Sequence, residues 1–136
     1  MRIDAEREAW RAMRSLVLDH NDRKRDVSAA LGMSFIRIKA LRHLAGGPLA
    51  MRDLSVALST DASYTTHVVD DLEARGLVVR APHPDDRRAK IVSSTAQGRR
   101  CAAKAESILA TPPVTMRGLS DQDLIELQRM LAVLLG

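Results

Sequence analysis

Apolar side chains recur at helical spacing along most of the chain. Near the N-terminus they form one stripe over residues 4–18, made of Ala9, Trp10, Met13, Leu16 and Val17. Polar residues 19–22 weaken this helix, and Gly32 ends its continuation. Similar stripes predict a second helix that starts at a Ser34 N-cap and stops at Gly46, a short helix over 51–58, and a longer one over 61–75 that Gly76 ends.

The periodicity changes after residue 76. Residues 77–80 and 89–93 are β-rich runs, and the charged segment between them contains two prolines, so a β-hairpin with a long, charged tip is predicted. Helical spacing returns over 96–110 and stops at Thr111-Pro112-Pro113. Ser120 and Asp123 predict a capping box for a last helix. Its leucines follow a coiled-coil spacing: Leu124, Leu127, Leu131 and Leu134.

The pattern therefore predicts a mostly α fold with a small β-hairpin. The last helix is too apolar on one face to stand alone. Its leucine stripe packs either on the core of the chain itself or against another subunit.

Composition excludes several classes of protein. The 136 residues suit one domain, and only three are aromatic, too few for a single-strand nucleic-acid platform that stacks successive bases. No uncharged stretch exceeds ten residues, so no transmembrane segment and no membrane partner are expected. Cys101 is the single cysteine, and a small buried residue is its simplest role. No secretory signal is visible, so a reducing, cytoplasmic setting is expected.

The net charge of +4 is unevenly placed. Residues 34–60 carry four basic and one acidic side chain, residues 77–100 carry six and two, and residues 61–76 between them carry one and four. Two basic blocks around an acidic segment suggest a polyanionic partner, although charge alone fits an ordinary solvated surface equally well.

The order of the predicted elements is more informative than any one of them. A short helix, a tight turn and a longer helix form a helix-turn-helix, whose second helix can enter the DNA major groove. A hairpin that carries Arg87, Arg88 and Lys90 can lie beside it and reach phosphates or the minor groove. The alternative is a winged-helix protein-interaction module that meets an acidic partner without binding DNA.

The motifs in this region resemble those of the MarR-type winged-helix transcriptional regulators. The resemblance runs over about residues 34–100 and is most specific between Leu72 and Lys90. It rests on Gly47-Pro48-Leu49, Leu54, the run from Leu72 to Arg80 (LEARGLVVR), the run from Pro84 to Lys90 (PDDRRAK), and Thr95-Ala96-Gln97-Gly98.

The resemblance implies a homodimeric transcriptional regulator, most often a repressor, bound to a pseudo-palindromic double-stranded operator. It implies a helical dimerisation region at 1–33 and 96–136 around a winged helix-turn-helix lobe at 34–95. Many members are released by small aromatic or phenolic ligands.

Positions that match the family's DNA-binding motifs are carried over residue by residue. In the recognition helix they are Ser63, Tyr64, Thr65, Thr66 and His67, and in the wing Asp86, Arg87, Arg88 and Lys90. Asp86 is expected to fix an arginine through a bidentate pair. Asp71 stands where many members place a cation, so the acidic end of this helix should face the protein. Ser94 replaces a usual leucine and should loosen the end of its strand.

A ligand site is predicted less sharply. Residues that could line a cleft between the dimerisation helices and the lobe are Trp10, Met13, Val17, His20 and His43, although packing is the simpler role for most of them. No catalytic grouping, cofactor motif or metal-ligand spacing is present, so an enzyme is not expected. A small enzyme or a metal-dependent sensor is the remaining rival.

Overall fold

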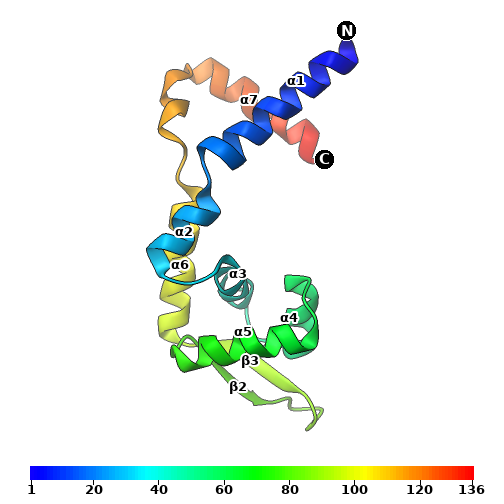
Figure 1. The fold of residues 1–136 in the computed structure, drawn as a ribbon, viewed down its shortest axis with the longest axis vertical. Helices are drawn as coiled ribbons and strands as arrows, with labels where there is room; N and C mark the ends of the chain where they lie inside the picture. The colour runs from blue at the N-terminus through cyan, green and yellow to red at the C-terminus, as the bar shows by residue number, and fades with distance from the viewer.

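The computed structural model describes all 136 residues. It has two parts, a lobe that holds the sheet and helices α3, α4 and α5, and an arm formed by the two ends of the chain (Figure 1). The elements in order are α1 (Arg2–Arg14), η1 (Ser15–His20), α2 (Arg23–Leu31), α3 (Phe35–Leu44), β1 (Leu49–Ala50), α4 (Met51–Leu58), α5 (Ala62–Ala74), β2 (Val78–Pro82), β3 (Lys90–Ser94), α6 (Ala96–Ala110), η2 (Val114–Gly118) and α7 (Asp121–Leu135). The mostly α fold with a small β wing is confirmed.

Short polar side chains start several of these helices. Asp61 accepts a hydrogen bond from the Tyr64 backbone N–H at 2.7 Å, and Ser120 with Asp123 forms the predicted capping box of α7. Ser34 occupies the predicted N-cap of α3, but its hydroxyl accepts from Arg37 Nη1 at 2.7 Å and accepts no backbone N–H of the helix.

The sheet is antiparallel, with strand order β1-β3-β2. In the hairpin, Val78 faces Ser94 and Pro82 faces Lys90. Strand β1 was not predicted; its two residues, Leu49 and Ala50, pair with β3 and tie the start of α4 to the wing. The sheet thereby fixes the hairpin to the helix-turn-helix.

One apolar core fills the lobe. It joins α3, α4, α5, both hairpin strands and α6, and its fully buried members include Leu41, Leu54, Leu72 and Val92. Helix α6 comes so close to β2 that a Cβ at Gly98 would overlap the backbone carbonyl of Leu77. Glycine is therefore required where α6 crosses the start of the wing.

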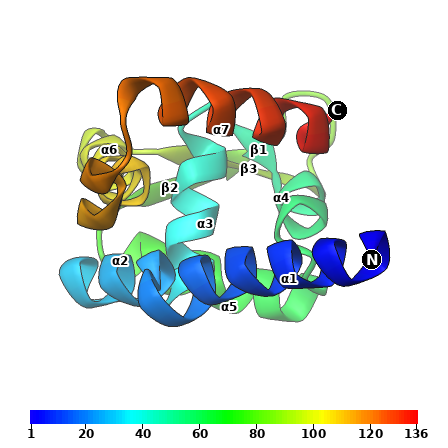
Figure 2. The same cartoon turned by 90° about the horizontal axis from the view of Figure 1, so that it is seen from above.

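The arm has no core of its own. Helices α1 and α7 contain no buried residue, and Figures 1 and 2 show them at the end of the molecule opposite the sheet, with α3 below them in the lobe. Much of the predicted apolar stripes is exposed in the protomer: Trp10 keeps 60% of its surface and Leu134 keeps 67%, while Met13, Leu124 and Leu127 are half-buried. None of the helices combines the length and the apolar character that a membrane span requires.

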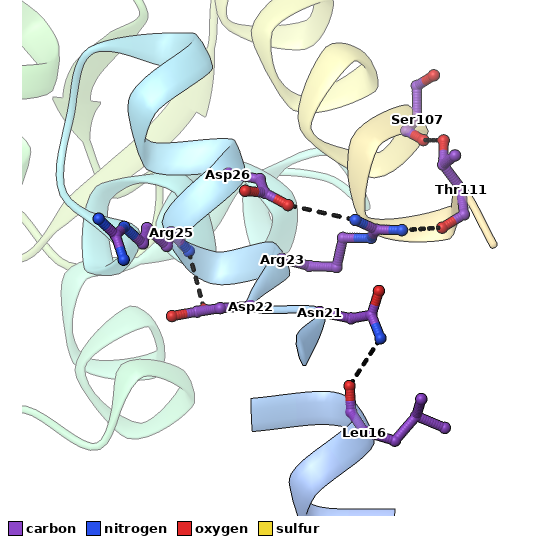
Figure 3. Close-up of polar contacts among 8 residues, drawn as sticks. All are labelled: Leu16, Asn21, Asp22, Arg23, Arg25, Asp26, Ser107 and Thr111. Carbon is purple, nitrogen blue, oxygen red and sulfur yellow. Dashed lines mark hydrogen bonds and ion pairs between the residues drawn. The ribbon is translucent and has the colours of Figure 1, made fainter. Parts of the chain in front are cut away.

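Polar contacts mark the joint between arm and lobe (Figure 3). Asn21 donates to the Leu16 carbonyl at 2.8 Å and closes η1, and Asp22 caps α2 by accepting from the Arg25 backbone at 3.1 Å. Arg23 then donates to the Thr111 carbonyl at 3.1 Å. This bond joins the first turn of α2 to the end of α6, where the chain passes back into the arm.

Candidate nucleic-acid interface

The first turns of α5 present a polar, exposed surface. Ser63, Tyr64, Thr66 and His67 are all exposed, and Tyr64 keeps 44% of its surface. The rings of Tyr64 and His67 stack with their centroids 6.3 Å apart, so the two side chains lie together on one face of the helix. These four side chains are free to meet a partner.

Thr65 does not belong to this surface. It is fully buried, and its hydroxyl lies 2.7 Å from the hydroxyls of Ser55 and Thr60 and 2.8 Å from the Asp61 carbonyl. The prediction that it contacts DNA is therefore withdrawn. Its role is structural, since it holds the turn between α4 and α5 from the inside.

The other end of α5 is tied to the protein by ion pairs. Asp71 accepts from Arg37 at 2.7 Å and from Arg75 at 2.8 Å. The hydrogen bonds from Arg75 and then Arg37 hold the pKa of the Asp71 carboxyl below its ordinary value. The expectation that this acidic end faces the protein is met.

Arg80 makes the corresponding link to the wing. It pairs with Glu73 at 3.0 Å and with Asp70 at 2.6 Å, so the first hairpin strand is locked to α5. The hydrogen bonds from the Arg80 side chain and backbone lower the pKa of Glu73. The four acidic groups of residues 61–76 are thus a helix cap (Asp61) and three ion-pair partners.

The tip of the wing is exposed and positively charged. Arg87, Arg88 and Lys90 are exposed, and their side chains make no hydrogen bond or ion pair within the protomer. Asp86 does not hold an arginine side chain as predicted; its carboxylate accepts from the Arg88 backbone N–H at 3.0 Å. It shapes the loop, and both arginines stay available.

The two surfaces lie at the same side of the lobe. Figures 1 and 2 show the hairpin loop and the N-terminal end of α5 on one side, together with α4, and α6 on the other. Arg52 of α4 is exposed beside Thr66, where both line a small cleft between α4 and α5. Arg52 was not predicted from the sequence, where its only signal is its place in the first turn of α4.

A separate apolar cavity of about 410 Å³ lies at the joint between arm and lobe. Of the five predicted ligand residues, only Met13 and Val17 line it. Trp10, His20 and His43 do not, and all three are exposed. The structure therefore does not bring the predicted ligand residues together, and the cavity is instead completed by residues of the joint and of α7: Leu16, Asn21, Arg23, Leu109, Thr111, Pro113, Met116, Leu127 and Leu131.

The sequence was compared with models of protein families and with curated protein sequences. Residues 31–89 match a model of the MarR family. No curated protein sequence matches the chain.

Three solved structures share the fold. The transcriptional regulator BldR from Sulfolobus solfataricus is 26% identical, with a TM-score of 0.65 over 99% of this chain and 97% of that one. A point mutant of MepR from S. aureus, bound to an oligodeoxyribonucleotide, is 18% identical, with a TM-score of 0.74 over 93% and 95%. NadR in complex with 4-hydroxyphenylacetate is 22% identical, with a TM-score of 0.62 over 96% and 89%. Residues 31–89 are thus similar to the MarR family, and the chain shares the winged-helix fold of these structures along nearly its whole length.

Proposed function

We propose that the protein binds double-stranded DNA as a sequence-specific transcriptional regulator. One observation carries the proposal: the exposed first turns of α5 and the unpaired arginines of the wing lie at the same side of one rigid lobe. A duplex set against that side meets both surfaces together. The DNA-bound structure of MepR, which has the same fold, supports this arrangement.

The side chains divide the work by their chemistry. Ser63, Tyr64 and His67 offer hydrogen-bond groups and ring edges for base contacts in the major groove. Thr66 and Arg52, which line one cleft at the mouth of the helix-turn-helix, suit phosphate contacts. Asp70 and Asp71 carry negative charge that would repel DNA, and their pairing with Arg80, Arg37 and Arg75 removes that obstacle.

The wing supplies the second set of contacts. Arg87, Arg88 and Lys90 are cations without partners, and guanidinium groups suit phosphates and the narrow minor groove. Contacts of this kind add affinity that depends strongly on salt.

We propose that the protein acts as a homodimer. Residues 1–33 and 96–136 form its dimerisation region and residues 34–95 its DNA-binding lobe. The support is the unburied apolar surface of α1 and α7, because an apolar stripe of that length is stable in water only when it is covered. A two-fold dimer would read a pseudo-palindrome with half-sites about 10 bp apart, or a multiple of that.

The cavity at the joint supports control by a small molecule. An apolar ligand there, of the aromatic class seen with NadR, would favour one angle between arm and lobe and so release DNA from a repressor. Addition of 4-hydroxyphenylacetate to the protein–DNA complex tests this part. Release in wild type but not after Leu127→Trp, which fills the cavity, is the expected result.

The DNA-binding proposal is tested by gel retardation of the fragment directly upstream of the gene. The wild-type protein should retard this fragment at moderate salt in the presence of excess unrelated duplex. Tyr64→Ala should weaken this preference more than it weakens binding to random DNA. Absence of retardation of either duplex would instead favour the alternative, a winged-helix module that binds an acidic protein.

A further inference from the structure

A second cleft lies on the side of the lobe away from the wing tip. It sits where the C-terminal end of α5 meets α6 and the end of α2, and has a volume of about 510 Å³. Eight residues line it: Leu31, Met33, Arg75, Leu77, Gln97, Arg100, Cys101 and Lys104. None of them lines the cavity at the joint or belongs to the proposed DNA-binding surface.

The charge of this cleft is positive and largely uncompensated. Arg100 and Lys104 stand one turn apart on α6, and neither side chain makes a hydrogen bond or ion pair in the structure. Arg75 forms the opposite wall; it shares the Asp71 carboxylate, 2.8 Å away, with Arg37, and its Nη1 donates to the Gly32 carbonyl at 3.4 Å. No acidic side chain lines the cleft, so two positive charges remain for a ligand.

The cleft is apolar between these cations. Leu31 and Met33 come from the end of α2, and Leu77 is almost completely buried at the start of the wing. Cys101 is half-buried, and its burial raises the pKa of the thiol above its ordinary value, against the opposing influence of Lys104 and Arg75.

From this arrangement we infer that the cleft binds a small organic anion with an apolar body. The anionic headgroup pairs with Arg100 and Lys104, and the body lies on Leu31, Met33 and Leu77. A volume of about 510 Å³ is in the range typical of small-molecule sites, and the combination of an apolar lining with a few convergent polar groups is typical of them too.

The single cysteine provides a reporter inside the cleft. The intact protein is alkylated with N-ethylmaleimide, and the rate of Cys101 modification is followed by mass spectrometry in the presence of three probes: octanoate, 1-octanol and inorganic phosphate. Octanoate has both the anionic headgroup and the apolar body. 1-Octanol has only the apolar body, and inorganic phosphate has only the anionic group. Octanoate should slow modification in a saturable way, and at equal concentration the other two should slow it far less.

Matched variants locate the headgroup. Arg100→Gln should raise the octanoate concentration for half-protection about tenfold, because a charge-assisted hydrogen bond is lost. Arg99→Gln is the control, since Arg99 is its neighbour on α6 but donates to the Ser94 carbonyl and faces another cleft. Its half-protection should stay at the wild-type value.

Three results would overturn the inference: no protection by octanoate, equal protection by phosphate alone, or the same loss in both variants. The assay contains no DNA, so its failure would leave the proposed DNA binding untouched, and a failed gel retardation would leave this site untouched.

Discussion

The lobe and the arm of this protein differ in how far they bury their apolar side chains. Every fully buried residue lies between Val27 and Ala105, and none lies in the outer segments on either side. The lobe covers its apolar side chains with its own helices and sheet. The arm carries apolar stripes just as regular and leaves them exposed, which teaches that amphipathic spacing predicts a helix but not what covers it.

The largest effect is expected from charged side chains introduced into the arm, which should disrupt the proposed dimer but leave the lobe folded. Leu131→Glu with Leu134→Glu places two unpaired carboxylates in the proposed dimer interface, where each costs several kcal/mol to bury. We expect the dimer dissociation constant to rise at least about 100-fold, measured by analytical ultracentrifugation. The lobe should keep its fold by circular dichroism. A variant that stays dimeric would remove α7 from the interface.

The next largest effect should come from the lobe. Gly98→Ala forces a methyl group into the Leu77 carbonyl, and we expect it to lower the free energy of unfolding by roughly 3 kcal/mol in urea titrations. Gly118→Ala is the matched control in the arm, because nothing lies within 4 Å of the added Cβ. Equal losses in the two variants would contradict the contrast between a packed lobe and an open arm.

Removal of one wing cation should affect binding and leave the fold intact. Arg88→Ala should weaken binding to all duplexes and flatten the slope of log K against log salt by up to about 1. Arg117→Ala, which removes an exposed cation from the arm, should leave the slope unchanged. Gel retardation at several salt concentrations measures both, and an unaltered slope in Arg88→Ala would take the wing out of the proposed interface.

A gain of stability is expected at the end of the wing. The Ser94 hydroxyl is buried and has no hydrogen-bond partner in the structure, which fits the expected loosening at this position. Ser94→Ala removes the unsatisfied group, and the free energy of unfolding should rise by about 1 kcal/mol. A decrease on urea denaturation would mean that the hydroxyl is satisfied in solution.

The smallest effect is one of pH. The folded-state pKa of Asp71 lies below its unfolded value, so its pairing stabilises the protein above that ordinary value, near 3.8, and the contribution is lost as the pH falls through the lower folded pKa. The stability difference between wild type and Asp71→Asn should therefore shrink as the pH falls below 4. Urea titrations of both proteins over this pH range measure the difference, and a difference that stays constant would contradict the role of the pairing.

Helix-terminating segments made most of the fold predictable from the sequence. Gly46-Gly47-Pro48 and Ser59-Thr60-Asp61 bracket α4, and Thr111-Pro112-Pro113 ends α6, so both helices were predicted with the bounds they have. Strand β1 was missed because two residues after a proline carry no period. The π-helix η1 was missed because apolar spacing over six residues does not distinguish it from an α-helix.

The candidate surface was predicted unevenly. Thr65 precedes Val68 and Val69 by three and four residues, so its place on the buried face of α5 was legible from spacing alone. Asp86 was assigned to a side-chain partner, because sequence does not distinguish a carboxylate that binds an arginine from one that binds the backbone of its own loop. Arg100 and Lys104 gave no signal, since the residues opposite them come from α2 and α5.

Helix α6 links the wing to the joint between arm and lobe, because its Gly98 packs tightly against the start of the wing. One end of this helix is fixed against the first residues of the wing, and its other end carries Thr111, where Arg23 anchors the joint. The helical rise over the 13 residues from Gly98 to Thr111 separates these two points by about 20 Å. Because Gly98 leaves no room for sliding, a tilt of α6 imposed at the arm would reach the hairpin as a rotation.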